Sequence, residues 1–189
     1  MKELSEQAER IEQDLASRLA PLRQRREIAE LAQVVSQVAA ALREDEVLVE
    51  FVAFTERPPE QKPEAPNGPL HYLALILAHD GEPAMIDLGP AILLEAAAVR
   101  LQAALSDPKA TYLAAATDSY QRLFAPLLPA FGGRTRVVIS ADGVLDLVPF
   151  AALHDGQKFV IASHHISYVT SGRDLLRSDD KNGGSHSIV

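Results

Sequence analysis

The spacing of apolar residues changes abruptly near residue 45, and this change constrains the fold more than any other feature of the sequence. Before it, apolar residues recur three or four positions apart, which is the period of an amphipathic helix: Leu4, Ala8, Ile11, Leu15, Leu19 and Leu22. After it, Val47–Phe54 is a continuous run of mainly β-branched and aromatic residues, which is typical of a strand. The change predicts a helical arm at residues 1–43 and an α/β domain at residues 44–189.

The helical arm is interrupted at Pro21, because proline lacks a backbone donor and clashes with the preceding turn. A second helix is predicted over residues 22–42, with one apolar stripe: Ile28, Leu31, Val35, Val38 and Leu42. Two helices with one apolar stripe each cannot bury both stripes by themselves. The arm is therefore expected to be an appendage and not a closed domain.

The rest of the chain predicts a strand meander, two helices and the first strands of a core sheet. The expected strands are residues 47–54, 71–78, 84–88, 134–140 and 159–170, with extended chain also at 144–148. The expected helices are residues 91–105 and 111–128, and a polar loop with five prolines separates the first two strands at 55–69. Helix 91–105 has the apolar set Ile92, Ala96, Val99 and Ala103, with Leu94, Ala98 and Leu101 adjoining it.

Charge and cysteine content exclude several functional classes. The 189-residue chain has a formal net charge of −8, so it lacks the basic field that attracts nucleic acid or an anionic membrane surface. It contains no cysteine, which excludes disulfides, thiolate nucleophiles and thiolate metal ligands within this chain. The amino terminus is polar and acidic, and no apolar run approaches the roughly 20 residues that span a bilayer. A soluble, cytoplasmic protein is expected.

No residue pattern in the chain predicts a catalytic, cofactor-binding or metal site. Gly172 and Gly184 stand beside serines, but neither lies in a nucleophile-elbow sequence, so a hydrolase using Ser140 or Ser185 with a histidine is disfavoured. His164 and His165 are adjacent in an expected strand, so they should point to opposite faces and cannot chelate one ion together. The carboxylates also form no pair across a defined cleft.

Several segments, taken in order, resemble the first half of a CHAT domain, a family in the caspase-like cysteine peptidase group. They are Val38–Phe51, Tyr120–Leu128, Arg136–Leu153 and Ile166–Leu176. The most specific of them reads Arg-Val-Val-Ile-Ser-Ala-Asp-Gly-Val-Leu-Asp-Leu-Val-Pro-Phe-Ala-Ala-Leu. Together they extend the resemblance over about residues 30 to 189.

The resemblance implies a partial caspase-like domain without its reactive residues. Active members of the family use a Cys nucleophile with a His base. No histidine here lies in the family's His-Gly context, and both catalytic positions would follow Val189. The chain is therefore expected to be an inactive amino-terminal part of the domain, with an unpaired sheet edge. Implied partners are a protein or peptide, tetratricopeptide repeats upstream and the catalytic half downstream.

A hypothesis about the complete domain concerns Ser140, Asp142, Gly143, Pro149 and Phe150. They follow an expected core strand, and ligands bind beside such strand ends in open α/β sheets. We expect them to shape the mouth of a binding cleft without performing chemistry. The alternative is a purely structural hairpin. The alternative for the whole chain is a non-enzymatic interaction module, with a helical arm on an α/β platform.

Overall fold

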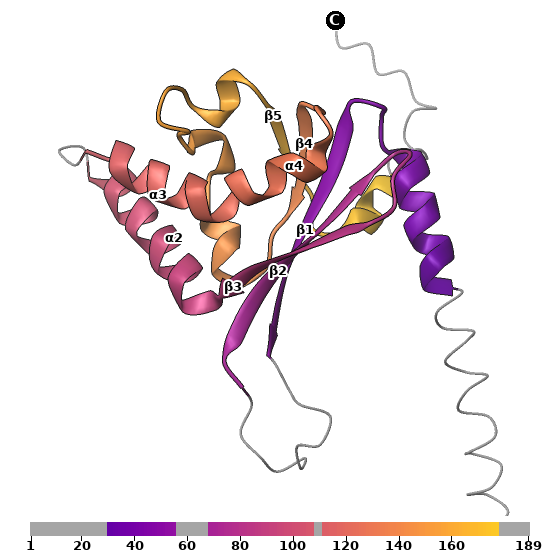
Figure 1. Cartoon of the computed structure of the whole chain (residues 1–189), viewed down its shortest axis with the longest axis horizontal. Coiled ribbons are helices and arrows are strands. Elements are labelled where there is room, and N and C mark those ends of the chain that lie inside the picture. The colour runs from indigo at the N-terminus through magenta and orange to yellow at the C-terminus, as the bar shows by residue number, and fades with distance from the viewer. Residues whose placement is uncertain (1–29, 56–67, 108–110, 178–189) are drawn as a thin grey trace, which may run out of the picture. The chain divides into compact units, whose positions relative to one another are not determined.

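The computed structural model describes residues 30–55, 68–107 and 111–177 (Figure 1). The chain divides into two compact units, Met1–Gln37 and Val38–Val189. Residues 30–41 are helical, which confirms the end of the second predicted helix. The first predicted helix and most of the proline-rich loop lie outside the described residues, as do Ser185 and His186.

Five strands of the second unit form one mixed sheet in the order β3-β2-β1-β4-β5 (Figure 1). Their bounds are β1 Glu46–Thr55, β2 Leu70–Ala78, β3 Ala84–Pro90, β4 Arg136–Ser140 and β5 His165–Tyr168. The pairs β1–β2 and β2–β3 are antiparallel, so the predicted meander is confirmed. β4 is parallel to β1, and β5 is parallel to β4. The α/β class is therefore confirmed.

The chain crosses from β3 to β4 through helices that lie on one face of the sheet (Figure 1). They are α2 Ala91–Ser106, α3 Leu113–Leu123, the 3-10 turn η1 Ala125–Leu127 and α4 Leu128–Phe131. The helix predicted over residues 111–128 is thus divided. Pro126 lies in the first turn of η1 and Pro129 lies in the first turn of α4, where the missing backbone donor costs no hydrogen bond.

The main core lies between this helical layer and one face of the sheet. Side chains alternate along a strand, so Val47, Val49 and Phe51 of β1 point toward the helices. They pack in a buried cluster with residues of the helical layer, including Leu94, Ala98, Leu101, Phe124, Leu127 and Phe131. On the opposite face, Leu48 and Val138 are also buried. The sheet is therefore covered on both faces over its central strands, which explains their near-continuous apolar sequence.

The buried face of α2 includes the adjoining apolar residues Leu94, Ala98 and Leu101 and not the main predicted set. Ile92 is 74% exposed and Val99 is 57% exposed, and Ala96 and Ala103 are exposed as well. The buried residues are instead Ala91, Leu94, Ala97, Ala98 and Leu101. α2 is apolar nearly all round, so its sequence does not select a face. Small alanines let α3 approach closely, and the buried Ser119 hydroxyl donates to the Ala97 carbonyl at 3.3 Å.

Two predicted extended segments are largely helical turns, and those predictions are wrong. Residues 143–147 form the 3-10 turn η2 (Gly143–Leu147), so no hairpin follows β4. Residues 159–170 begin with the turn η4 (Val160–Ala162), and only four residues form β5. The Val160 amide donates to the Leu153 carbonyl at 2.8 Å, which folds this segment back on the preceding turn, η3 (Phe150–Ala152).

Candidate functional site

The sequence-predicted residues lie at and beyond the carboxyl end of β4, where the parallel strands β1, β4 and β5 end on the same side of the sheet. Ser140 is the last residue of β4 and is only 6% exposed. Its hydroxyl donates to the Thr170 carbonyl at 2.9 Å, so it ties β4 to the chain that follows β5. A buried hydroxyl engaged in this way fits a structural role better than that of a nucleophile.

Asp142 extends the sheet with its side chain. The parallel ladder between β1 and β4 ends at the pair Glu50 and Ser140. Beyond it, the Asp142 carboxylate accepts a hydrogen bond from the Ala53 amide at 3.0 Å. A side-chain oxygen thus takes the place of the next strand carbonyl, because a backbone donor left without a partner is costly.

Gly143 lies against the hydroxyl of the buried Tyr72. Its φ is +59°, and a Cβ at this position would stand 2.7 Å from the Tyr72 hydroxyl oxygen. That hydroxyl lies 3.3 Å from both the Glu95 carboxylate and the Asp142 carbonyl. Burial, followed by the charge of Glu95, raises the pKa of Tyr72 to about 12. Glycine is therefore required both by the left-handed backbone and by the close approach of the ring.

Phe150 anchors the next turn in the core. Its ring is fully buried and stacks on Phe51, with ring centroids 5.3 Å apart. Its amide donates to the Tyr168 hydroxyl at 3.0 Å. Pro149 precedes η3, and its carbonyl accepts from the Ala152 amide at 2.8 Å. The turn is thus tied to β1 and to β5.

The structure therefore places the five predicted residues along one connection, beside the ends of β1 and β4. Their polar groups bond within the fold. The cavities that lie beside β5, along α3 and next to Arg134 are lined by none of the five. Their role in shaping a cleft therefore stays a prediction.

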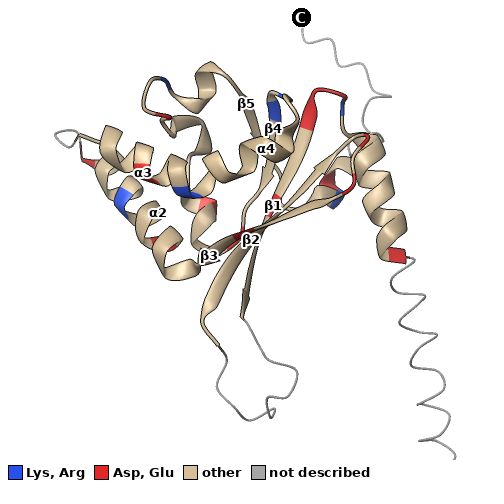
Figure 2. Ribbon diagram, in the orientation of Figure 1, with Lys and Arg blue, Asp and Glu red and all other residues tan. Residues whose placement is uncertain are grey.

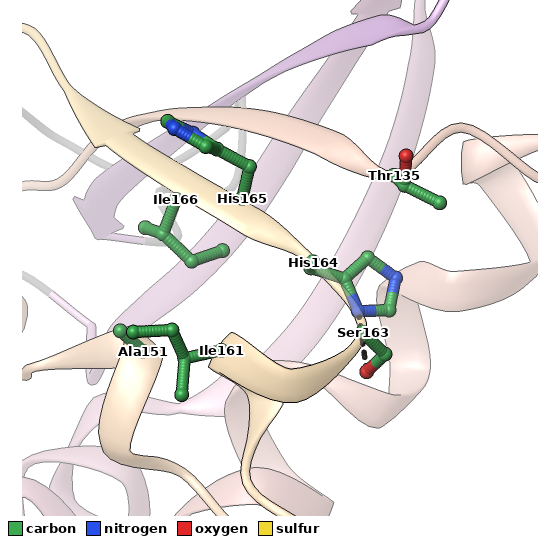
Figure 3. Close-up of a pocket in the computed structure, with 7 residues that line it drawn as sticks. All are labelled: Thr135, Ala151, Ile161, Ser163, His164, His165 and Ile166. Carbon is green, nitrogen blue, oxygen red and sulfur yellow. Dashed lines mark hydrogen bonds between the residues drawn. The ribbon is translucent and has the colours of Figure 1, made fainter.

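One cavity of about 390 Å³ lies beside β5 (Figure 3). Ala151, Ile161 and Ile166 give it an apolar wall, and its polar lining is Thr135, Ser163, His164 and His165. Figure 3 shows the rings of His164 and His165 directed away from each other, as the sequence predicts. The two imidazoles therefore do not converge on one ligand.

His164 packs against two aromatic rings beside this cavity. Its ring packs edge-on against Phe124 and Phe131, with centroids 5.3 and 6.1 Å away. Burial, and secondarily the charge of Lys158, holds its pKa below the usual range. Its Nδ1 lies 3.1 Å from the Ser163 hydroxyl. No carboxylate is found to orient this ring among the described residues, so the Ser–His pair lacks the third member of a triad.

Sequence reasoning missed the pair of Ser163 and His164. The only sequence feature that points to this pair is that the two residues are adjacent, and adjacent residues contact each other in many turns. The Ser163 hydroxyl also lies 3.4 Å from the Val160 carbonyl, as expected for a residue that closes a 3-10 turn.

Two further cavities are shallow. One of about 550 Å³ lies along α3 next to Asp118, whose carboxylate accepts from Arg100 at 2.7 Å and from Arg122 at 2.9 Å. Burial opposes ionisation of Asp118, but the two guanidinium groups outweigh it and lower the pKa. The other cavity, of about 330 Å³, is lined in part by Glu44, Asp45 and Arg134.

Two kinds of feature are absent within residues 30–55, 68–107 and 111–177. No three His, Asp or Glu side chains are grouped there so that they could hold a metal ion. No helix in these ranges is long and apolar enough to cross a membrane.

The fold defines an α/β domain with a mixed five-stranded sheet and a helical layer on one face. Within it, residues 113–188, less than half of the chain, match the family model described as the CHAT domain. The resemblance to a CHAT domain is therefore confirmed over this range. The match includes three of the four resembling segments and leaves out residues 38–51. No curated protein and no solved structure matches the chain.

Proposed function

We propose that residues 44–189 are the non-catalytic front part of a caspase-like CHAT domain and that the chain by itself hydrolyses no peptide. The match to the CHAT family over residues 113–188, in a sequence without a single cysteine, is the observation that supports this proposal. The family resemblance implies a Cys nucleophile activated by a His base, and this chain cannot supply that thiolate. The structural use of the Ser140 hydroxyl supports the same conclusion.

In this proposal the connection from Ser140 to Phe150 supports the cleft of the complete domain. Its hydrogen bonds to β1 and β5 and the stacking of Phe150 on Phe51 make it a rigid strand-end connection. Rigid supports of this kind hold binding residues in place, although they perform no chemistry themselves. The proposed partners are tetratricopeptide repeats upstream, the catalytic half downstream and a protein or peptide substrate, in the cytoplasm.

The coding DNA after codon 189 tests this proposal. We expect it to encode a strand ending in His-Gly and a later strand followed by Cys. A peptidase assay of residues 1–189 with a mixed fluorogenic peptide library should show no turnover above a buffer control. Enzyme-like hydrolysis would overturn the proposal. In that case the variants Ser163→Ala and Ser140→Ala would show which serine reacts.

A second candidate function is a non-enzymatic interaction module. The observation in its favour is the outer face of α2, where Ile92, Leu93 and Val99 are all more than half exposed. Clustered apolar side chains on a surface often mark protein contacts. A natural stop codon directly after codon 189 would favour this function over the first.

A further inference from the structure

The outer face of α2 carries an apolar stripe that is exposed in the part of the chain that the structure describes. Ile92, Ala96, Val99 and Ala103 follow each other at intervals of four, three and four residues, which places them in one line along the helix. Ile92 is 74% exposed and Val99 is 57% exposed, and both alanines are exposed as well. The inner side of α2 packs on β2, β3, α3 and η2. The stripe therefore points away from the core, and apolar surface of this kind often marks a protein contact.

This face is separate from the places where the described chain enters and leaves the domain. Leu48 is buried on the sheet face opposite the helical layer. Gly172, near the end of the described residues, lies against the side chains of Leu48 and Val38, so both described ends of this unit lie on that opposite face. In the proposed complete domain, further strands continue the sheet at β5, whereas α2 packs on β2 and β3 toward the other edge. The rest of the parent protein is therefore attached away from the stripe.

The stripe itself is uncharged, and α2 as a whole is neutral. Glu95 and Arg100 are the charged residues of this helix, in a chain with a formal net charge of −8 (Figure 2). Glu95 lies 3.3 Å from the Tyr72 hydroxyl, and Arg100 donates to the Asp118 carboxylate at 2.7 Å, so both charges are engaged within the fold. Two copies of an acidic chain repel each other, and a face without net charge is where they can approach most closely.

The order of side-chain sizes makes the stripe complementary to itself. Along the helix it reads large, small, large, small: Ile92, Ala96, Val99, Ala103. In a symmetric pair each contact occurs twice, so residue i of one copy meets residue j of the other and the reverse. When a second copy lies antiparallel across the middle of the stripe, position 92 faces position 103 of the other copy, and position 99 faces position 96. Every large side chain then meets a small one, which lets two helices pack closely.

We propose that a second copy of this chain covers the outer face of α2, with the two α2 helices antiparallel and the stripe of each copy at the interface. The shallow apolar groove along α3 borders the stripe, because it is lined in part by Asp118, the partner of Arg100. Helices of the lengths of α2 and α3 are about 24 and 16 Å long and about 10 Å wide, so this face offers roughly 400 Å² per copy. Stable complexes bury about 800 Å² per partner, so the dimer is weak and depends on concentration.

Disulfide cross-linking tests the antiparallel register, because the chain has no cysteine of its own. Ile92→Cys and Ala103→Cys both change exposed residues, so the core stays intact. In the proposed pair the two copies of position 92 are about 16 Å apart along the helices, which a disulfide cannot bridge, whereas position 92 faces position 103. We expect an equimolar mixture of the two variants to form covalent dimer at least tenfold faster than either variant alone.

Sedimentation equilibrium of residues 1–189 gives a second measurement. The apparent mass of the wild type should rise above that of the monomer as the concentration increases from about 1 to 500 µM, the range expected for a small interface. Val99→Glu places two like charges near the symmetry axis and should raise the dissociation constant at least tenfold. Met85→Glu on β3 and Ile161→Glu beside β5 are matched controls, because these residues are 71% and 69% exposed. Neither control should change the dissociation constant.

The proposal is overturned if the wild type stays monomeric over this range, if the mixture cross-links no faster than Ile92→Cys alone, or if Val99→Glu dimerises as tightly as Met85→Glu. It is also overturned if Ile161→Glu abolishes the dimer while Val99→Glu does not, because the association then uses another surface. Failure of a thiol reagent to modify Ile92→Cys in dilute protein would show that the chain itself covers the stripe, and would overturn it too.

This inference rests on the second candidate function, because it names the occupant of the face that supports that function. Failure of the dimer test removes the second copy as occupant, whereas the coding DNA after codon 189 still decides between the two candidate functions. No outcome depends on peptidase activity, so this test and that of the proposed function fail separately.

Discussion

Replacing Gly143 by alanine should destabilise the domain through two separable effects. The first is the left-handed backbone, with φ at +59°, which costs an alanine about 1 kcal/mol. The second is the contact of the new Cβ with the Tyr72 hydroxyl oxygen, only 2.7 Å away. Tyr72 is 1% exposed, so its ring cannot swing aside freely.

The displaced hydroxyl loses its contacts with the Asp142 carbonyl and with Glu95. Loss of a buried hydrogen bond of this kind costs about 1 to 2 kcal/mol. We therefore expect Gly143→Ala to lower the free energy of unfolding by about 2 to 3 kcal/mol, measured by urea denaturation at constant m-value. Gly133→Ala is the matched control, because Gly133 also has a positive φ of +83°, but a Cβ at that position would meet no atom within 4 Å. It should lose only about 1 kcal/mol.

A double-mutant cycle separates the two effects. In a Tyr72→Phe background the oxygen is absent, so Gly143→Ala should cost only the backbone contribution of about 1 kcal/mol. The reasoning is refuted if Gly143→Ala costs no more than Gly133→Ala, or if its cost is the same in both backgrounds.

Three further outcomes are expected. Phe150→Ala should cost about 3 to 5 kcal/mol in the same assay, because it removes a fully buried ring that stacks on Phe51; a loss below about 1 kcal/mol would contradict the packing. The pKa of His164 is lower in the folded state than in the unfolded chain, so the unfolded chain binds the proton more readily. The neutral His164 ring therefore contributes to stability above its unfolded pKa, and this contribution is lost as the pH falls. His164→Phe, which keeps an aromatic ring, should therefore show a weaker decrease in melting temperature than the wild type on acidification from pH 7, and parallel pH profiles would contradict this. In an alkaline titration followed by ultraviolet absorbance, Tyr72 should ionise at a pKa of about 12. The titration of Tyr72 is obtained as the difference between the wild type and Tyr72→Phe. A difference that titrates near the ordinary tyrosine pKa would show that the ring is not buried as described.

The predicted elements were most accurate where the pattern was local. The run at Val47–Phe54 and its two successors predicted the meander, because β-branched and aromatic residues favour extended chain wherever they lie. The prediction of a turn at Gly143 succeeded for the same reason, since a glycine after an aspartate adopts positive φ at little cost. The resemblance to the CHAT family was likewise readable from ordered segments, and the family match supports it over residues 113–188.

The candidate site was predicted only in part. The sequence placed Ser140 and Phe150 at a strand end, but the partners of their polar groups come from distant segments. The Asp142 carboxylate bonds to an amide 89 positions away, and the Ser140 hydroxyl bonds to a carbonyl 30 positions away. The spacing of residues along the sequence does not predict hydrogen bonds between such distant positions. The cavity beside β5 was missed because its wall combines η3, η4 and β5.

The sequence by itself determined the three-stranded meander and the helical crossover that follows it, because period, β-branching, proline and glycine act on the nearest few residues. Only the tertiary structure decided which face of the apolar helix α2 is buried, since Leu94 and Leu101 point to the core while Ile92 and Val99 do not. Tertiary contacts also shortened the last strand to the residues that pair with β4. Burial and strand pairing depend on neighbours brought together by the fold, and those neighbours are distant in the sequence.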